Sequence, residues 1–188
     1  MTTFSKIGLC CVALFSCLSL ASAQSPDLAD PCGDPAKESQ VWGIVKGQVV
    51  KVEDGDTVLI SLRDKYHKEK SLKRIHLIGI DAPESGETFG EPSRLLLEGL
   101  VRNRVIEVWV KTDISFRSRL PAEMTGVAHL RNLQMLDVNL MMIVSGMARY
   151  KDAEPYSMSN YAECHYVRAE EEARTARRGL WYRRSPTE

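Results

Sequence analysis

The chain has 188 residues, of which 44% are hydrophobic and 27% are charged, and both values are ordinary for a single globular domain. Its 25 basic and 25 acidic side chains cancel. This balance excludes a strongly basic protein that holds nucleic acid by its overall charge, so any such binding requires a local site.

The amino-terminal segment has the three parts of a secretory signal. Lys6 precedes an apolar run at 7–20, and a triplet of small residues ends at Ala23. We therefore expect a signal peptide at 1–23 and a secreted or periplasmic protein. A membrane anchor is one alternative, although the run is shorter than the roughly 20 apolar residues that span a bilayer. A lipoprotein signal at Cys17 is another.

Removal of this segment would leave two cysteines, Cys32 and Cys164. Two cysteines in an oxidising compartment favour one disulfide, which would tie the segment around Cys32 to the carboxyl-terminal helix. Two unpaired thiols are the alternative, because the sequence shows no geometry.

The remaining chain divides into a tether, a domain and a tail. Residues 24–40 are polar and contain three prolines, which is typical of a flexible tether. The folded domain is expected over 41–182, and a short tail over 183–188.

Five strands are expected within this domain. β-rich runs at 41–52, 56–62 and 70–80 are separated by short polar turns and predict a meander. Two further strands are expected at 105–110 and 126–130.

About three helices accompany the strands. The first is expected over 90–103. Asp137 as an N-cap and Gly146 as a C-cap predict a short second helix. A long terminal helix is expected to start near Tyr161 and to stop at Gly179. Five strands and about three helices predict an α+β domain built on an OB-type five-stranded β-barrel.

Three carboxylates stand at strand ends that a meander brings together. Asp56 lies at the mouth of the second strand, and Asp81 and Glu84 follow the third. Hard cations such as Ca²⁺ take oxygen ligands, so Asp56, Asp81 and the carbonyl of Ala82 form a plausible partial metal site. Glu84 could be a general base that takes a proton from water. Alternatively, residues 54–56 are simply a hairpin turn.

Six segments, in order, resemble the staphylococcal-nuclease-like (thermonuclease) family: VEDGDTV, IHLIGIDAPE, FGEPSRLLLEGLV, IEVWV, LDVNLMMIVSGMARY and AEEEARTARRGLW. The resemblance covers about 45–181. It implies an OB-type barrel with three helices and a Ca²⁺-dependent phosphodiesterase that cuts DNA and RNA. It also implies that Asp56, Asp81 and the carbonyl of Ala82 bind calcium and that Glu84 is the base.

The two arginines that hold the phosphate in this family are less evident. His76 stands at the first position, and an imidazole lacks the charged bidentate fork of a guanidinium. Arg74, on the same strand face, is a possible substitute. Arg117 ends a D-x-x-x-R segment suited to the second role, and Arg119 is a further option. Otherwise the role falls to Thr125 and is lost. We favour Arg117, because a surface loop tolerates insertion.

Two tyrosines complete the expected site. Tyr150 and Tyr156 could stack on bases, although half-buried structural tyrosines are equally compatible with the sequence. The sequence thus predicts an exported, monomeric Ca²⁺-dependent nuclease of DNA and RNA with no stable membrane association. The alternatives are an OB-type nucleic-acid-binding module without nuclease activity and an exported interaction domain.

Overall fold

The computed structural model describes residues 30–34, 43–62, 71–110, 120–131, 135–152 and 158–182. The expected signal peptide, Arg117, Arg119 and Tyr156 lie outside these described residues. Among the helices of the described ranges, none is both long and apolar enough to cross a membrane.

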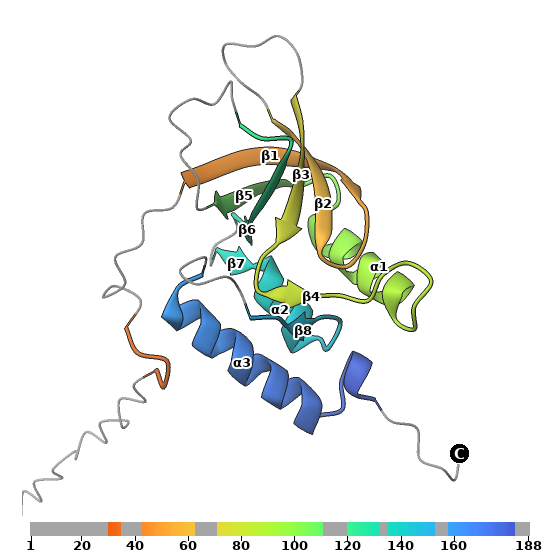
Figure 1. Cartoon of the computed structure of the whole chain (residues 1–188), viewed down its shortest axis with the longest axis vertical. Coiled ribbons are helices and arrows are strands. Elements are labelled where there is room, and N and C mark those ends of the chain that lie inside the picture. The colour runs from red at the N-terminus through yellow and green to blue at the C-terminus, as the bar shows by residue number, and fades with distance from the viewer. Residues whose placement is uncertain are drawn as a thin grey trace, which may run out of the picture.

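Five strands form a closed mixed barrel, seen in the upper part of Figure 1. Antiparallel pairing gives the order β3-β2-β1-β5-β6, and a parallel pairing of β3 with β6 closes the barrel. The expectation of an α+β, OB-type five-stranded barrel is confirmed. The strands are β1 (Gly43–Val52), β2 (Thr57–Leu62), β3 (Ser71–Leu77), β5 (Val105–Val110) and β6 (Glu123–Leu130).

Three helices and a second small sheet lie beside the barrel, with α2 packed between β6 and α3 (Figure 1). Asp137 caps α2 as expected, since its side chain accepts a hydrogen bond of 2.9 Å from the Leu140 amide. Gly146 ends the turn after this helix with a φ of 68°. The remaining elements are β4 (Ile80–Asp81), α1 (Gly90–Val101), β7 (Leu136–Asp137), α2 (Val138–Val144), β8 (Arg149–Tyr150), α3 (Asn160–Thr175) and the 3-10 helix η3 (Gly179–Trp181).

The third strand ends earlier than the sequence predicted. It stops at Leu77, and Gly79 turns the chain with a φ of 75°. Ile80 and Asp81 then form β4, which pairs with β8 instead of continuing along the barrel. The expected strand at 70–80 is therefore two strands, and the break directs Asp81 into a separate two-stranded sheet.

Two other boundaries also differ from expectation. The terminal helix ends at Thr175, four residues before Gly179. The chain turns there to pack Gly179 on the end of α2, where a Cβ atom would lie 2.2 Å from the Gly146 carbonyl oxygen. Strand β6 begins at Glu123 rather than 126, because its amino-terminal half pairs with β3.

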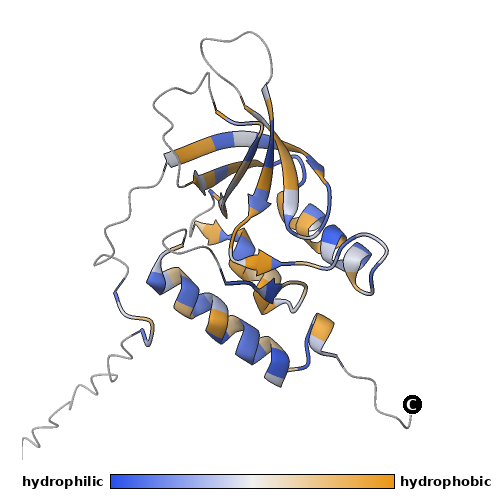
Figure 2. Cartoon of the chain, in the orientation of Figure 1, coloured by the Kyte–Doolittle hydropathy of each residue, from blue (hydrophilic) through white to orange (hydrophobic). Residues whose placement is uncertain are grey.

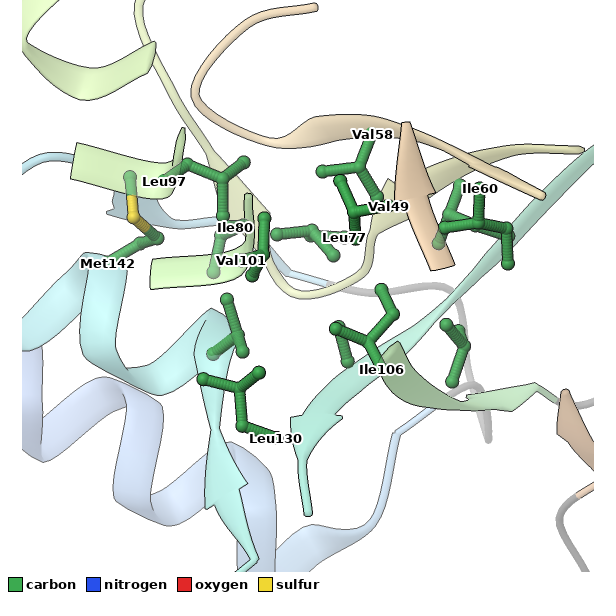
Figure 3. Close-up of a cluster of buried hydrophobic side chains, with 14 of the residues drawn as sticks. Val49, Val58, Ile60, Leu77, Ile80, Leu97, Val101, Ile106, Leu130 and Met142 are labelled. Atoms are coloured by element: carbon green, nitrogen blue, oxygen red, sulfur yellow. The ribbon is translucent and has the colours of Figure 1, made fainter. Parts of the chain in front are cut away.

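The core joins the barrel interior to the inner faces of α1 and α2. In Figure 3 Ile60 and Ile106 from the strands lie in one apolar cluster with Leu97 and Met142 from the helices, and all four are fully buried. Figure 2 shows hydrophobic colour concentrated in the strands and α2, whereas α3 is largely hydrophilic. α3 nevertheless contributes the fully buried Tyr166 to the same core, so all three helices are anchored to it.

The segment before the barrel is attached to α3. Cys32 and Cys164 form a disulfide with their Cα atoms 5.6 Å apart. Beside it, an Asp30 carboxylate oxygen lies 2.7 Å from the Tyr161 hydroxyl, which donates to it, and 3.1 Å from His165 Nε2. At least residues 30–34 of the expected tether are thus held against the domain.

Candidate active site

The turn between β1 and β2 places Asp56. The Asp54 carboxylate accepts a hydrogen bond of 3.0 Å from the Asp56 amide, as in a typical Asx turn. Gly55 packs directly against two other elements, since a Cβ atom there would lie 2.0 Å from Ser93 Oγ and 2.6 Å from Ala82 Cβ. Only glycine lets this turn approach α1 and the residue after β4, so Asp56 is held close to Ala82.

The Asp56 carboxylate is hydrogen-bonded on both oxygens. Oδ2 accepts from the Ala82 amide at 3.1 Å, and Oδ1 accepts from the Thr57 hydroxyl at 2.9 Å. Burial raises the pKa of Asp56, and the neighbouring Asp54 carboxylate adds to that rise. The ionised form therefore gains from a nearby cation.

A lysine lies on the second aspartate. Lys151 Nζ is 2.9 Å from Asp81 Oδ1, and this partner raises the pKa of Lys151. The Lys151 amide donates to the Gly79 carbonyl at 3.1 Å, which fixes the backbone just beyond β8. Asp81 is thus paired with the ammonium group of Lys151, at the position where the sequence predicted a metal ion.

Glu84 lies on a tight turn before α1. Its amide donates to Glu87 Oε2 at 3.0 Å, and its carbonyl accepts from the Glu87 amide at 3.1 Å. A Cβ atom on Gly90 would lie 1.9 Å from the Glu84 carbonyl oxygen, so the turn packs closely on the start of the helix. The backbone of Glu84 is held while its side chain is exposed.

These groups border one cleft of about 610 Å³. Among the residues that the structure describes, Lys151 is the only lysine or arginine that lines it, so carboxylates predominate. The charged lining residues are Asp54, Asp56, Asp81, Glu84, Asp152 and Lys151.

His76 and Thr125 lie side by side on the cleft wall. They are partners in the parallel ladder between β3 and β6, and both line the cleft. His76 Nδ1 is 3.2 Å from the Thr57 hydroxyl oxygen. The same hydroxyl donates to Asp56, so Thr57 links the imidazole to that carboxylate. An imidazole at this position lacks the charged bidentate fork with which a guanidinium binds phosphate.

Arg74 does not line the cleft. Its Nε donates to Glu53 Oε2 at 2.7 Å, and Nη1 donates to Glu123 Oε1 at 2.5 Å. The expected substitute for His76 is therefore held on the outside of the barrel by two carboxylates.

Tyr150 also lies away from the cleft lining. Its hydroxyl donates to Glu163 Oε1 on α3 at 2.9 Å, and its ring packs against the core. In the structure, Tyr150 therefore joins β8 to α3 instead of lining the cleft.

Two residues of the site were not identified from the sequence. Asn139 is fully buried on α2, where its side-chain amide donates to the Ile78 carbonyl at 2.9 Å and accepts from the Ala128 amide at 3.0 Å. Asn139 thereby holds the turn before β4 against β6. The sequence signal for this role was a single amide side chain in an otherwise apolar helix. Lys151 lies 70 positions from Asp81, so no local pattern indicated their pairing.

The donor set fits a hard divalent cation. The carboxylates of Asp56 and Asp81 stand beside Ala82, whose carbonyl is the predicted third ligand. In the described ranges, one group of three Asp, Glu, His or Cys side chains has its ligand atoms within 4.8 Å of one another. It consists of Asp30, Cys32 and His165, at the disulfide and not in the cleft. Glu84 therefore does not close a three-carboxylate cage, which leaves it available for another role.

Comparison with known proteins identifies the family. Residues 74–183 match the family described as staphylococcal nuclease homologue. Protein ParB of Escherichia coli is 34% identical over 145 residues, 76% of each chain. Micrococcal nuclease of Shigella flexneri is 30% identical over 148 residues, 74% of this chain and 75% of the relative. An uncharacterized endonuclease of Haemophilus influenzae is 32% identical over 142 residues, 75% of this chain and 68% of the relative. The chain belongs to the family of staphylococcal nuclease homologues.

Proposed function

We propose that this protein is an exported, Ca²⁺-dependent nuclease that hydrolyses phosphodiester bonds of DNA and RNA. One observation carries the proposal: the carboxylates of Asp56, Asp81 and Glu84 open into one cleft beside the barrel. The names of two relatives, a micrococcal nuclease and an endonuclease, support the same activity.

Each residue of the cleft has a defined task in this proposal. Asp56, Asp81 and the Ala82 carbonyl would hold the ion, which when bound polarises a phosphate oxygen. Glu84 takes a proton from the attacking water onto its carboxylate. His76 and Thr125 form part of the cleft wall.

A second candidate is an OB-type module that binds nucleic acid without cutting it. The observation in its favour is that His76 and Thr125 stand together on the cleft wall and that no arginine lines it in the described ranges. Electrostatic stabilisation of the developing charge is commonly the largest contribution to such catalysis, so the missing arginines bear directly on activity. Arg117 remains the predicted source of that charge.

Nuclease assays discriminate the two functions. The chain without residues 1–23 is incubated with DNA and with RNA, in calcium or in excess chelator. We expect cleavage only with calcium. Glu84→Gln should lower cleavage by roughly 10²- to 10⁴-fold, the usual contribution of a general base, and should leave the calcium-induced rise in melting temperature intact. Retention of single-stranded DNA without cleavage would support the binding module.

Export is tested separately from activity. When the full chain is expressed in a bacterium with an oxidising periplasm, we expect the exported form to begin at Gln24. Cys32 and Cys164 should resist alkylation in this material until it is reduced, because export would place them where disulfides persist. A cytoplasmic product that retains residues 1–23 would contradict export.

A further inference from the structure

Lys151 is placed between two possible partners. Its ammonium contacts Asp81 Oδ1 at 2.9 Å, and the same side chain lines the cleft. A divalent cation on Asp81 would repel the ammonium and remove its partner. The head group would then pair with another anion, either a cleft carboxylate such as Asp152 or the phosphate of a bound substrate.

The backbone and the side chain of Lys151 differ in freedom. The amide is fixed to Gly79, and the preceding Tyr150 amide is hydrogen-bonded to Glu170 Oε1 at 3.2 Å. The side chain, in contrast, is 64% exposed and ends in a flexible four-carbon stem. The ammonium can therefore leave Asp81 while β8 stays in place.

The rest of the described cleft wall gives a phosphate little positive charge. Asp54, Glu84 and Asp152 repel it, and Thr125 is neutral. A bound polynucleotide needs cations along its backbone. Lys151 is the one lysine or arginine that the described lining offers.

We propose that Lys151 is an exchangeable counter-ion: it holds Asp81 when no divalent cation is bound, and it moves to the substrate phosphate when a cation takes Asp81. This proposal rests on the proposed nuclease function. The same residue then competes with the metal and assists the substrate.

This dual role gives one substitution two effects of opposite sign. Lys151→Gln removes the competitor from Asp81, so calcium should bind more tightly, by roughly two- to tenfold, as expected for loss of a partly exposed ion pair. It also removes the charge that meets the phosphate. Binding of a nucleoside bisphosphate in the presence of calcium should weaken by about tenfold or more, and cleavage should fall with it.

The experiment measures calcium affinity by titration calorimetry, affinity for thymidine 3′,5′-bisphosphate in calcium, and cleavage of single-stranded DNA. Lys151→Arg keeps the charge and should retain wild-type values within a fewfold. Lys51→Gln is the matched control, because Lys51 is 63% exposed, faces the Glu53 carboxylate at 3.6 Å and does not line the cleft. It should leave all three quantities unchanged.

Each outcome separates this inference from the proposed function. Calcium affinity that is equal or weaker in Lys151→Gln overturns the exchange. Unchanged bisphosphate affinity in that variant overturns the phosphate contact. If Lys51→Gln matches Lys151→Gln, the effect is general charge and the inference also fails. A wild-type protein that binds calcium but never cleaves refutes the nuclease function, whereas the calcium titration still decides the exchange.

Discussion

The acidic side of the cleft and the cations near it are held in place by different means. On the acidic side, Asp56 is fixed by an Asx turn and by the Ala82 amide. Gly55 also contributes, because its lack of a side chain lets the turn pack closely against α1. Two cations near the cleft are long side chains held by carboxylates: Arg74 is engaged outside the cleft, and Lys151 is engaged within it by Asp81. Short side chains on tight turns are placed by the backbone, whereas long ones go to whichever partner is nearest.

This difference separates what is preorganised from what must rearrange. Asp56 is held in place by its own turn, whereas Asp81 is paired with Lys151. Among the described lining residues Lys151 is the one lysine or arginine, and Arg117 and Arg119, outside the described ranges, are the predicted further sources of positive charge. Variants of each side therefore test the comparison, and those of the acidic side should have the largest effects.

Among the variants that follow, Asp56→Asn should have the largest effect. It removes a predicted metal ligand, and since a bound ion contributes several kcal/mol, cleavage should fall roughly a thousandfold. The calcium-induced rise in melting temperature should disappear. Calcium calorimetry with nuclease assays measures both. Unaltered calcium binding would show that Asp56 is not a ligand.

The same variant should stabilise the calcium-free protein. Burial raises the pKa of Asp56, so its ionised form is disfavoured in the fold, and a neutral amide of the same shape removes that penalty. A group with a raised folded pKa destabilises at neutral pH and ceases to do so as it becomes protonated. The gain in melting temperature should therefore be present at neutral pH and vanish in acid.

Arg117→Ala tests whether the loop supplies the positive charge. If Arg117 meets the phosphate, cleavage should fall about 10²- to 10³-fold, as for loss of one group that stabilises developing charge. Arg119→Ala is the control and should change little. Equal, small effects of both variants in a cleavage assay would mean that the charge comes from elsewhere.

His76→Arg should raise cleavage. A guanidinium would add the charged, bidentate donor that an imidazole lacks, a gain of about 10- to 100-fold in rate. Glu123 could capture the new side chain, because its Oε2 already lies 3.9 Å from His76 Nε2. The variant is therefore assayed alone and with Glu123→Gln. No gain in either background would show that this wall does not contact the reacting phosphate.

The acidic side was largely predictable because its signals are local. The Asp-Gly turn and the Asp137 cap each depend on a few neighbouring residues, and the structure has both. Such turn and cap chemistry is set by backbone geometry, which sequence patterns report directly.

The placement of the cations could not be predicted, because the residues that they contact are remote in sequence. Arg74 meets Glu53 and Glu123, which lie 21 and 49 positions away. The early end of β3 depends on the buried Asn139, which contacts the chain 61 positions before it. Strand spacing showed that Arg74 shares a face with His76, but it could not show which carboxylates compete for a flexible guanidinium.

Arg74→Gln should have the smallest effect on cleavage. Any large effect would therefore contradict the placement of Arg74 outside the cleft. With its guanidinium held by Glu53 and Glu123 outside the cleft, its loss should change the rate by less than about twofold, within the effect of an ordinary surface substitution. Arg102→Gln, which removes an exposed arginine paired with Glu98 at 3.3 Å, is the control. A severe fall in cleavage for Arg74→Gln alone would show that Arg74 leaves its carboxylates for the phosphate.

Arg74→Gln should instead lower the melting temperature slightly, and in a pH-dependent way. The guanidinium holds the pKa of Glu53 below its ordinary value of 4.5. A carboxylate with a depressed folded pKa contributes stability above its unfolded pKa and loses it as the pH falls through the folded value. The difference in melting temperature between wild type and Arg74→Gln should therefore be full at neutral pH and shrink below pH 4.5. A difference that persisted unchanged in acid would mean that Arg74 stabilises the fold through its packing and not through Glu53.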